Sequence, residues 1–307
     1  MKQILTVLTL AVFGFCAATW AVGQGSAPAS DASAITPAAR PQTAERTGQE
    51  LLVQATQELT QLPSLDAKLR LTTNLLGKEL VGSGSYYQLV RENETLLKLE
   101  LKMQVAQQVS SLLQVSDGRF LWVRRDLPQK KSLSRIDQRR VREAIAQAPA
   151  IPVAHLQSSW MALGGLGKLL QALENSFQFS PAVAGQLRGV DVWTLEGTWR
   201  PNKLAELWPD QAPALLAGQT VDLAKLPTQL PERVQVVLSR DPAIPLFPYR
   251  IEYQRRGRAG EFEPMVTLEL FEIRRNVALD PRLFAYKPGD QEVADETELY
   301  LARLGLK

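Results

Sequence analysis

The chain has very few of the side chains on which most catalytic and metal sites depend. Its 307 residues include one cysteine, Cys16, and one histidine, His155. Cys16 lies inside an N-terminal apolar run, so an exported chain that has lost this run carries neither a disulfide nor a thiolate nucleophile. A single imidazole excludes sites that need two histidines, and we interpret His155 as structural. The sequence therefore predicts no enzyme, no catalytic residue, no metal and no cofactor.

A concentrated basic surface is also lacking. The chain has 35 basic and 32 acidic residues, which gives a formal net charge of +3. Nucleic-acid binding needs basic side chains gathered on one surface, so we expect no nucleic-acid partner. Residues 164–168 (GGLGK) resemble a phosphate-binding loop only faintly, because Leu169 stands where such a loop requires Ser or Thr.

Long hydrophobic runs are missing apart from one at the N-terminus. After Met1 and Lys2, an apolar run extends from Ile4 to Trp20 and is followed by small residues up to Gly23. This order is typical of a secretory signal and is too short for a stable membrane span, although a retained anchor is the alternative. We predict a signal peptide over residues 1–23, a disordered linker rich in Ala, Ser and Pro over 24–43, and a periplasmic or otherwise exported protein.

What the sequence does contain is a repeated alternation of apolar and polar residues. Residues 97–105 read LKLELKMQV, which places Leu97, Leu99, Leu101 and Met103 on one face of a strand. Similar patterns place the following residues on the same kind of face: Leu69, Leu71, Val236, Leu238, Leu268 and Leu270. These patterns predict an antiparallel sheet with one apolar side and one polar side.

The order of elements predicts an α+β protein. Predicted strands cover residues 65–76, 79–90, 95–105, 110–115, 119–125, 131–136, 190–199, 234–239, 249–255 and 265–274. A capping box at residues 47–50 begins one helix, and a charged helix is expected over 137–147. A second apolar stripe from Trp160 to Phe177 indicates another helix, which three glycines at 164, 165 and 167 should weaken by about 1 kcal/mol each.

Three phrases in this order resemble the outer-membrane lipoprotein carrier (LolA/LolB-like) family. They are residues 82–87 (GSGSYY), 116–122 (SDGRFLW) and 284–293 (FAYKPGDQEV). The resemblance covers most of residues 47–293 and implies a domain over 44–307, with insertions at 137–158 and 201–231. It also implies a strongly curved antiparallel sheet, or half-open β-barrel, with helices covering its concave apolar face. Arg70 and Arg91 do not fit the buried arginine with which this family latches its lid.

The resemblance further implies a non-enzymatic carrier, chaperone or sensor that binds lipoprotein acyl chains or other lipids. On this view the apolar strand residues line a cavity with Trp122 or Phe120 at its wall. The segment from Leu163 to Leu173, including Leu166 and Leu170, would act as a lid. Expected partners are a lipid or an acylated protein and a further envelope protein, with the carrier itself a monomer.

An alternative interpretation stays open at this stage. An aliphatic strand face is normally part of a filled core, so the chain could be a structural or protein-interaction module of the cell envelope with no lipid ligand. A hydrolase based on paired carboxylates has less support, because the acidic residues near 290–298 have the pattern of a solvated run. The two leading interpretations differ only in what lies against the apolar face.

Overall fold

The computed structural model describes residues 36–37, 47–75, 78–92, 94–105, 108–147, 161, 164–257 and 259–306. The predicted signal peptide lies outside these residues, as does most of the predicted linker. Within that linker, Thr36–Pro37 form a short strand, β1, that pairs with β9 (Val183–Leu187), so these two residues belong to the sheet. Among the described residues, no helix has the length and apolar character needed to cross a membrane.

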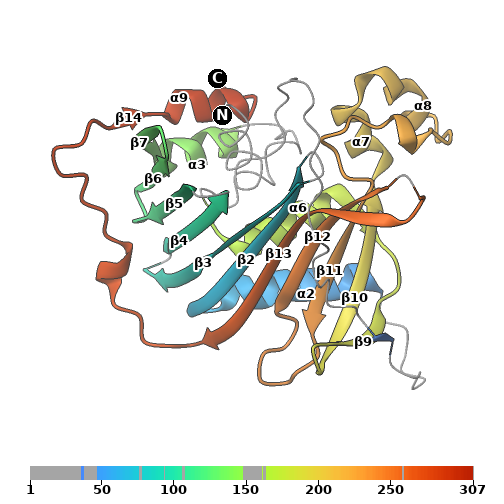
Figure 1. The fold of residues 1–307 in the computed structure, drawn as a ribbon, viewed down its shortest axis with the longest axis horizontal. Helices are drawn as coiled ribbons and strands as arrows, with labels where there is room; N and C mark the ends of the chain where they lie inside the picture. Colours follow the sequence, from blue (N-terminus) through green and yellow to red (C-terminus); the bar gives the residue numbers. More distant parts are fainter. Residues whose placement is uncertain are drawn as a thin grey trace.

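One large curved sheet that does not close forms the body of the molecule (Figure 1). Its order is β1-β9-β10-β11-β12-β13-β2-β3-β4-β5-β6-β7-β14, with β8 paired to β10. The main strands are β2 (Ser64–Leu75), β3 (Lys78–Arg91), β4 (Glu94–Val105), β5 (Gln108–Ser116), β6 (Phe120–Leu127), β7 (Lys130–Asp137), β10 (Val190–Trp199), β11 (Arg233–Ser239), β12 (Pro248–Arg256) and β13 (Phe262–Arg275). The predicted antiparallel sheet is confirmed, and each predicted strand is present within a few residues of its expected ends.

Besides β1, three short strands were not expected from the sequence. They are β8 (Phe177–Phe179), β9 (Val183–Leu187) and β14 (Ala294–Asp295). β14 runs parallel to β7, whereas the other neighbouring strands are antiparallel. These segments are too short for an alternating pattern to stand out, which is why sequence periodicity did not identify them.

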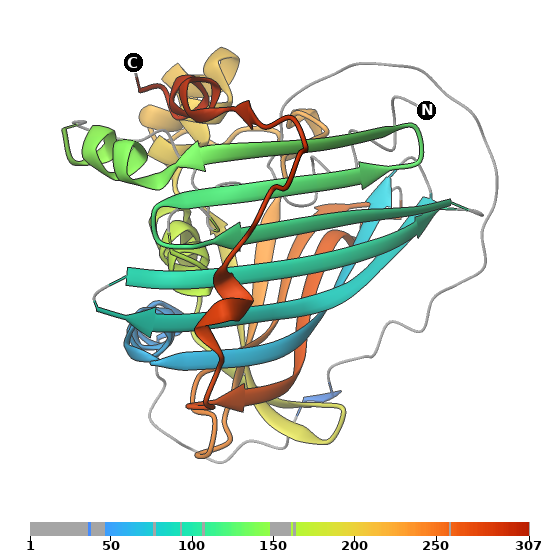
Figure 2. The ribbon, with the colours of Figure 1, turned by 90° about the vertical axis from the view of Figure 1, so that its left-hand side faces the viewer.

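The described residues include six α-helices besides the sheet. They are α2 (Gly48–Gln61), α3 (Gln138–Gln147), α6 (Leu166–Ser176), α7 (Pro201–Leu207), α8 (Ala212–Leu216) and α9 (Thr297–Arg303). The predicted capping box is confirmed: the Thr47 hydroxyl accepts from the Glu50 amide at 3.2 Å, and the Glu50 carboxylate accepts from the Thr47 amide at 3.3 Å. In Figure 2, α2 and α6 lie behind the sheet.

The prediction that three glycines weaken the helix after Trp160 is wrong for two of them. α6 begins at Leu166, so Gly164 and Gly165 precede it, with φ angles of 130° and 80°. Only Gly167 lies within the helix. The two preceding glycines therefore shape the entry into α6, because L-residues rarely adopt these φ values.

The C-terminal residues cross the outer side of the sheet as a strap, which we define as residues 276–296 (Figure 2). Phe284 of the strap is buried, and the Tyr286 ring stacks on the Trp122 ring with a centroid distance of 5.5 Å. Beyond the strap, Tyr300 and Leu301 of α9 join the main core. The third phrase of the family resemblance thus forms packing contacts along this strap.

The proline-punctuated stretch at 201–231 forms a small helical unit next to the sheet. Besides α7 and α8 it holds two 3₁₀ turns, at Pro209–Gln211 and Leu223–Lys225. Its apolar residues form their own cluster around Trp208. The Trp199 indole donates to the Pro231 carbonyl at 2.7 Å and ties the unit to β10.

Candidate ligand-binding face

The apolar side chains of the central strands meet on the concave side of the sheet, which we call the inner face. The register pairs Leu101 of β4 with Gly84 of β3 and with Leu112 of β5, so side chains of the same parity share this side. They belong to one cluster with residues of α2 and α6. The leucine alternation of β4 therefore forms part of a continuous apolar surface that includes several neighbouring strands.

Two glycines of β3 allow side chains and backbone of β4 to come close. A Cβ atom at Gly82 would lie 3.0 Å from Cδ1 of Leu101. A Cβ atom at Gly84 would lie 1.7 Å from the Glu100 carbonyl oxygen, which no side chain can tolerate. The glycines in the first resemblance phrase thus have a packing role on the inner face.

Tyr86 connects the inner face to both helices. Its hydroxyl donates to Gln88 Oε1 at 2.9 Å and accepts from the Leu166 amide at the start of α6 at 3.2 Å. Gln88 Nε2 in turn donates to the Leu59 carbonyl of α2 at 3.4 Å. Burial raises the pKa of the Tyr86 phenol, and the hydrogen bond from Leu166 offsets part of this rise. The phenol therefore stays neutral at physiological pH.

The inner face also contains buried polar atoms that have no hydrogen-bond partner among the described residues. These are Thr73 Oγ1, Ser110 Oγ and Gln114 Oε1. Ser110 and Gln114 are each only 1% exposed, and Thr73 is 6% exposed. Ser110 pairs with Met103, and Gln114 pairs with Leu99, which places both on the apolar side of β5. Buried polar groups in native proteins are nearly always hydrogen-bonded, so these atoms need an explanation.

Arg125 brings a positive charge to the same side of the sheet. It follows Leu121 and Val123 at spacing two on β6, and both of those residues belong to the inner cluster. Its guanidinium donates to Ser134 Oγ at 3.3 Å and lies 3.7 Å from Glu296 Oε2. Burial lowers the pKa of Arg125, the charge of Glu296 raises it, and that of Arg303 lowers it further. Strand periodicity could have identified this arginine.

Most of the residues predicted to bind ligand lie together on the inner face. The following are exposed by 5% or less in one cluster: Leu69, Leu71, Leu97, Leu99, Leu101, Met103, Leu166, Leu170, Val236, Leu238 and Leu270. Leu268 is partly buried and packs against that cluster. Leu163 lies outside the described residues. The binding role of these residues stays a prediction.

The placement of Trp122 in the cavity wall is wrong. Trp122 points to the outer side of the sheet, where its indole donates to Asp117 Oδ2 at 2.9 Å and packs against Tyr286 of the strap. Phe120 lies in the same outer cluster. The reason is strand parity: Leu121 and Val123 occupy the inner face, so Phe120 and Trp122, which alternate with them, must face outward.

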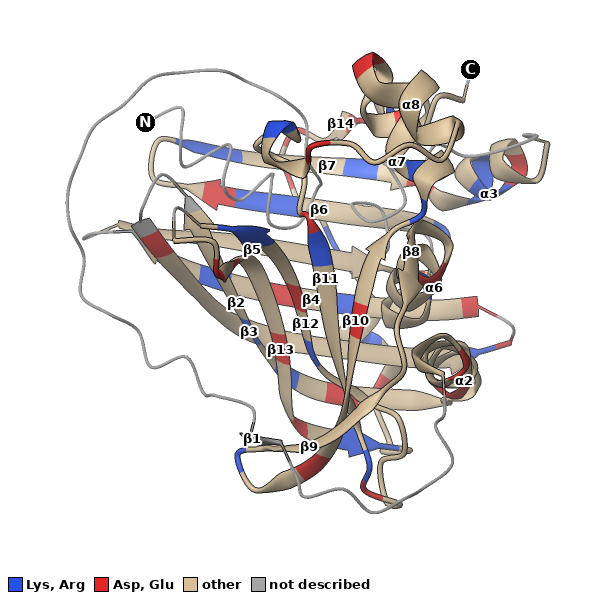
Figure 3. Cartoon of the chain, turned by 90° about the vertical axis from the view of Figure 1, so that its right-hand side faces the viewer, with Lys and Arg blue, Asp and Glu red and all other residues tan. Residues whose placement is uncertain are grey.

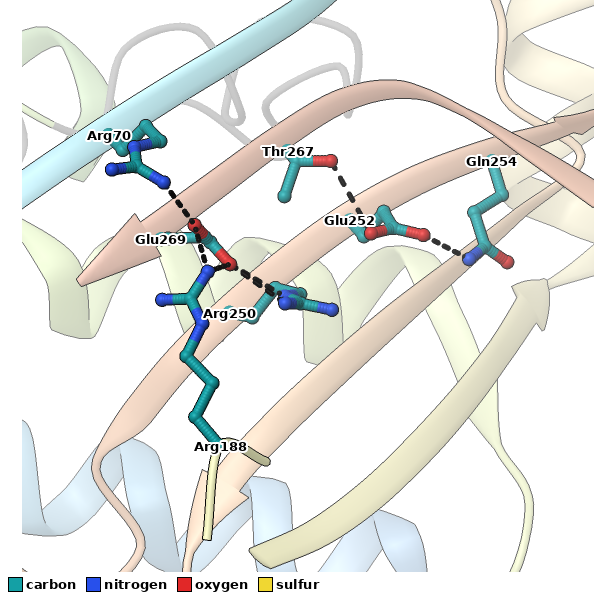
Figure 4. A network of polar contacts seen from close by, with 7 residues as sticks. All are labelled: Arg70, Arg188, Arg250, Glu252, Gln254, Thr267 and Glu269. Atoms are coloured by element: carbon teal, nitrogen blue, oxygen red, sulfur yellow. Dashed lines mark hydrogen bonds and ion pairs between the residues drawn. The ribbon is translucent and has the colours of Figure 1, made fainter. Parts of the chain in front are cut away.

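Lysine, arginine, aspartate and glutamate residues are spread along the strands of the sheet (Figure 3). Those that alternate with the inner residues, such as Lys98 and Glu100 of β4, lie on the outer side. Its most buried ion cluster is centred on Glu269 of β13 (Figure 4). Arg250 Nη2 lies 2.8 Å from the Glu269 carboxylate, Arg188 Nη2 lies 3.2 Å from it, and Arg70 Nη1 lies 3.9 Å from it. This cluster joins β2, β12, β13 and the β9–β10 turn.

Comparisons with known proteins give only distant likenesses. No family model and no curated protein matches the sequence. Among solved structures, a DUF1329 family protein from Desulfovibrio piger is 13% identical, with 78% of this chain and 96% of that chain covered and a TM-score of 0.34.

Two further solved structures are similarly distant. A putative outer membrane lipoprotein-sorting protein domain from Vibrio parahaemolyticus is 11% identical, with coverages of 77% and 95% and a TM-score of 0.30. The Mycobacterium tuberculosis lipoprotein LppX is 15% identical, with coverages of 76% and 100% and a TM-score of 0.36. At these values the likeness carries no functional inference, so function must be inferred from the residues of this chain.

Proposed function

We propose that this chain is a non-enzymatic carrier or sensor that binds acyl chains against its inner face. The observation that supports this most is the set of unpartnered polar atoms of Thr73, Ser110 and Gln114 within an apolar surface. An unsatisfied buried polar group costs about 1–3 kcal/mol of stability. Three such groups on one apolar surface are therefore unfavourable in a core that is already complete. A ligand with an apolar chain and hydrogen-bonding atoms would satisfy both the leucines and these polar groups.

In this proposal α6 is the element that moves to admit the ligand. It is joined to the preceding chain through Gly164 and Gly165, and its amide at Leu166 donates to the Tyr86 hydroxyl. Local opening needs few broken polar contacts at such a helix start. Displacement of α6 would bring Leu97 and its neighbours into contact with an entering acyl chain.

The proposed ligand and setting follow from the same features. The N-terminal pattern favours export to the periplasm or an equivalent compartment. There the protein would bind a lipid or an acylated protein as a monomer and transfer it to, or report it to, an envelope protein. No catalytic step is part of this proposal.

A second candidate is a structural or protein-interaction module with a filled core. The observation that favours it is the burial of the inner leucines by other parts of the chain, since Leu97 is 0% exposed and Leu101 is 2% exposed. Both candidates predict a stable sheet. They differ in whether an acyl ligand binds and in what a buried charge does to that binding.

The test is native mass spectrometry of the protein purified from its own envelope, followed by titration with a fluorescent fatty-acyl probe. Leu101→Glu places a carboxylate on the inner face, and Val109→Glu is the control on exposed β5 surface, since Val109 is 60% exposed. A carrier shows a non-covalent acyl mass and probe binding that Leu101→Glu abolishes and Val109→Glu preserves. A filled core shows neither mass nor binding, and Leu101→Glu lowers the stability by more than the 1.5–3 kcal/mol that leucine burial contributes.

A further inference from the structure

We infer that one edge of the sheet docks onto an anionic lipid surface. This edge, which we call the basic rim, comprises residues 119–147 and 294–303 and thus includes β7, α3 and α9. These three elements lie together at the top of Figures 1 and 2, and α9 contacts both α3 and β7. The inference goes beyond the proposed function, because it concerns the outside of the molecule and holds whether or not the inner face binds acyl chains.

Positive charge is concentrated at the basic rim, although the charges of the whole chain are nearly balanced. Residues 119–142 contain nine of the 35 basic residues and only two of the 32 acidic ones. The rest of the chain therefore holds 26 basic and 30 acidic residues. The prediction that the chain lacks a concentrated basic surface is wrong for this edge, where Figure 3 shows Lys and Arg along β7 and on α3. The net charge of the whole chain hides this local excess.

Four of these basic side chains are exposed and have no acidic partner among the described residues. They are Arg119, Lys130, Lys131 and Arg142. Arg119 lies over the Phe120 ring, 4.9 Å from the ring centroid, and Arg142 donates to a backbone carbonyl at 3.2 Å. Neither contact neutralises a positive charge, so both guanidinium groups keep their full charge at the surface.

The other charges of the basic rim cancel one another. Ion pairs join Arg135 to Asp295 at 3.2 Å and Arg139 to Glu143 at 2.8 Å. The whole rim holds ten basic residues and six acidic ones, which are Asp126, Asp137, Glu143, Asp295, Glu296 and Glu298. The surplus of four positive charges equals the number of exposed basic side chains that have no acidic partner among the described residues.

These four charges are spread along the length of the rim. Lys130 and Lys131 begin β7. Arg119 and Arg142 lie at the other end of β7, where the Gln138 amide donates to the Arg119 carbonyl at 2.9 Å. A strand of eight residues is roughly 25 Å long. A single small anion cannot contact both ends of such an edge, whereas a flat surface that carries many negative charges can.

Leu299 favours a lipid surface over other extended anions. It belongs to α9 and is 50% exposed. The preceding residue, Glu298, pairs with Arg140 of α3, which holds Leu299 beside the basic residues. Apolar side chains next to basic ones are typical of helices that lie in the interface of a membrane. The phosphate backbone of a nucleic acid offers leucine no comparable apolar environment.

The test is sedimentation of the protein, purified from its own envelope, with vesicles of phosphatidylcholine alone or mixed with phosphatidylglycerol. Two double variants remove the unpaired charges at either end of β7: Lys130→Ser with Lys131→Ser, and Arg119→Ser with Arg142→Ser. Leu299→Ser removes the exposed leucine. Lys130→Arg with Lys131→Arg keeps the charge and should bind like the wild-type protein.

Matched controls make the same kinds of change outside the basic rim. Arg91→Ser with Arg282→Ser removes two exposed positive charges. Val183→Ser removes an apolar side chain that is 58% exposed on β9, at the bottom of Figure 1. Urea unfolding of every variant verifies that the substitutions leave the folded state intact.

We expect the wild-type protein to bind vesicles that contain phosphatidylglycerol and to bind pure phosphatidylcholine much more weakly. Each serine double variant of the rim should lower the partition onto anionic vesicles by roughly tenfold or more, because each basic residue near an anionic surface strengthens binding several-fold. Molar salt should cause a similar loss by screening the charges. Leu299→Ser should weaken binding by a smaller factor, whereas both controls should bind like the wild-type protein.

Three results would overturn the inference. These are equal binding to both kinds of vesicle, equal losses in the rim variants and in their controls, and tighter binding to single-stranded DNA or polyglutamate than to anionic vesicles at the same ionic strength. The fluorescent fatty-acyl probe separates this inference from the proposed function. If the probe does not bind but the anionic vesicles do, the acyl carrier is refuted and the docking surface stands.

Discussion

Replacement of Gly165 by alanine should break the junction between α6 and the inner face. Gly165 has φ 80° and ψ −154°, a region that is essentially restricted to glycine. A Cβ atom there would lie 2.3 Å from the Tyr86 hydroxyl and 2.9 Å from Cδ2 of Leu97. The methyl group therefore conflicts with the backbone geometry and with the two side chains that receive the helix.

The expected loss of stability can be estimated from two contributions. The disallowed backbone conformation costs on the order of 1–3 kcal/mol. Displacing Tyr86 breaks its hydrogen bond from the Leu166 amide and leaves a buried donor unsatisfied, at about 1–3 kcal/mol. We therefore expect Gly165→Ala to lower the free energy of unfolding by about 2–6 kcal/mol, a large part of the roughly 5–15 kcal/mol of a typical domain.

Urea unfolding and hydrogen exchange across residues 166–176 provide the measurement, with Gly167→Ala as the matched control. Gly167 lies within α6, and its added Cβ would lie 3.0 Å from the Thr60 hydroxyl and at ordinary contact distance from its other neighbours. Alanine there gains about 1 kcal/mol of helix propensity, which offsets the close contact. Gly165→Ala should lose protection throughout α6, whereas Gly167→Ala should keep it. Equal stability and equal exchange in the two variants would refute this account of the junction.

Three further results are expected. Glu269→Leu should lower the free energy of unfolding by about 3–5 kcal/mol, because it leaves the buried Arg250 guanidinium without its closest carboxylate. Adding Arg250→Met should restore most of this loss when stability is measured by urea unfolding. A double variant as unstable as Glu269→Leu alone would contradict the expected role of this ion pair. Trp122→Ala should lower the free energy of unfolding by about 3–5 kcal/mol and expose the strap at Tyr286 to limited proteolysis. Unchanged cleavage would show that this stacking contact does not hold the strap in place. Burial raises the pKa of Tyr86 above its value in the unfolded chain, which is near 10. The contribution of the neutral Tyr86 phenol to the free energy of unfolding is therefore complete below pH 10 and is lost as the pH rises above it. Absorbance at 295 nm should therefore show that Tyr86, like Tyr253, whose pKa burial also raises, does not titrate before alkaline unfolding, and Tyr86→Phe should leave the number of titrating tyrosines unchanged.

The sequence alone determined the strands and their faces. Alternation along β4 identified Leu97 to Met103 as one apolar side, because successive side chains of a strand point to opposite faces. The capping box at Thr47 identified the start of α2, because it depends only on residues three apart in the chain. These are local rules, and long-range contacts did not override them.

Only the tertiary structure decided which surfaces those faces meet. Trp122 follows the same alternation as its neighbours, yet the side it occupies became clear only when Leu121 and Val123 packed into the inner cluster and the strap covered the other side. From the sequence, Gly165 was interpreted as a residue that weakens a helix. Its positive φ and its close approach to Tyr86 depend on β3, a strand 80 residues away in the chain, so the sequence could not reveal them. Contacts between residues that are far apart in the sequence leave no periodic pattern in the chain. The candidate site and its unpartnered polar atoms therefore became visible only in the folded structure.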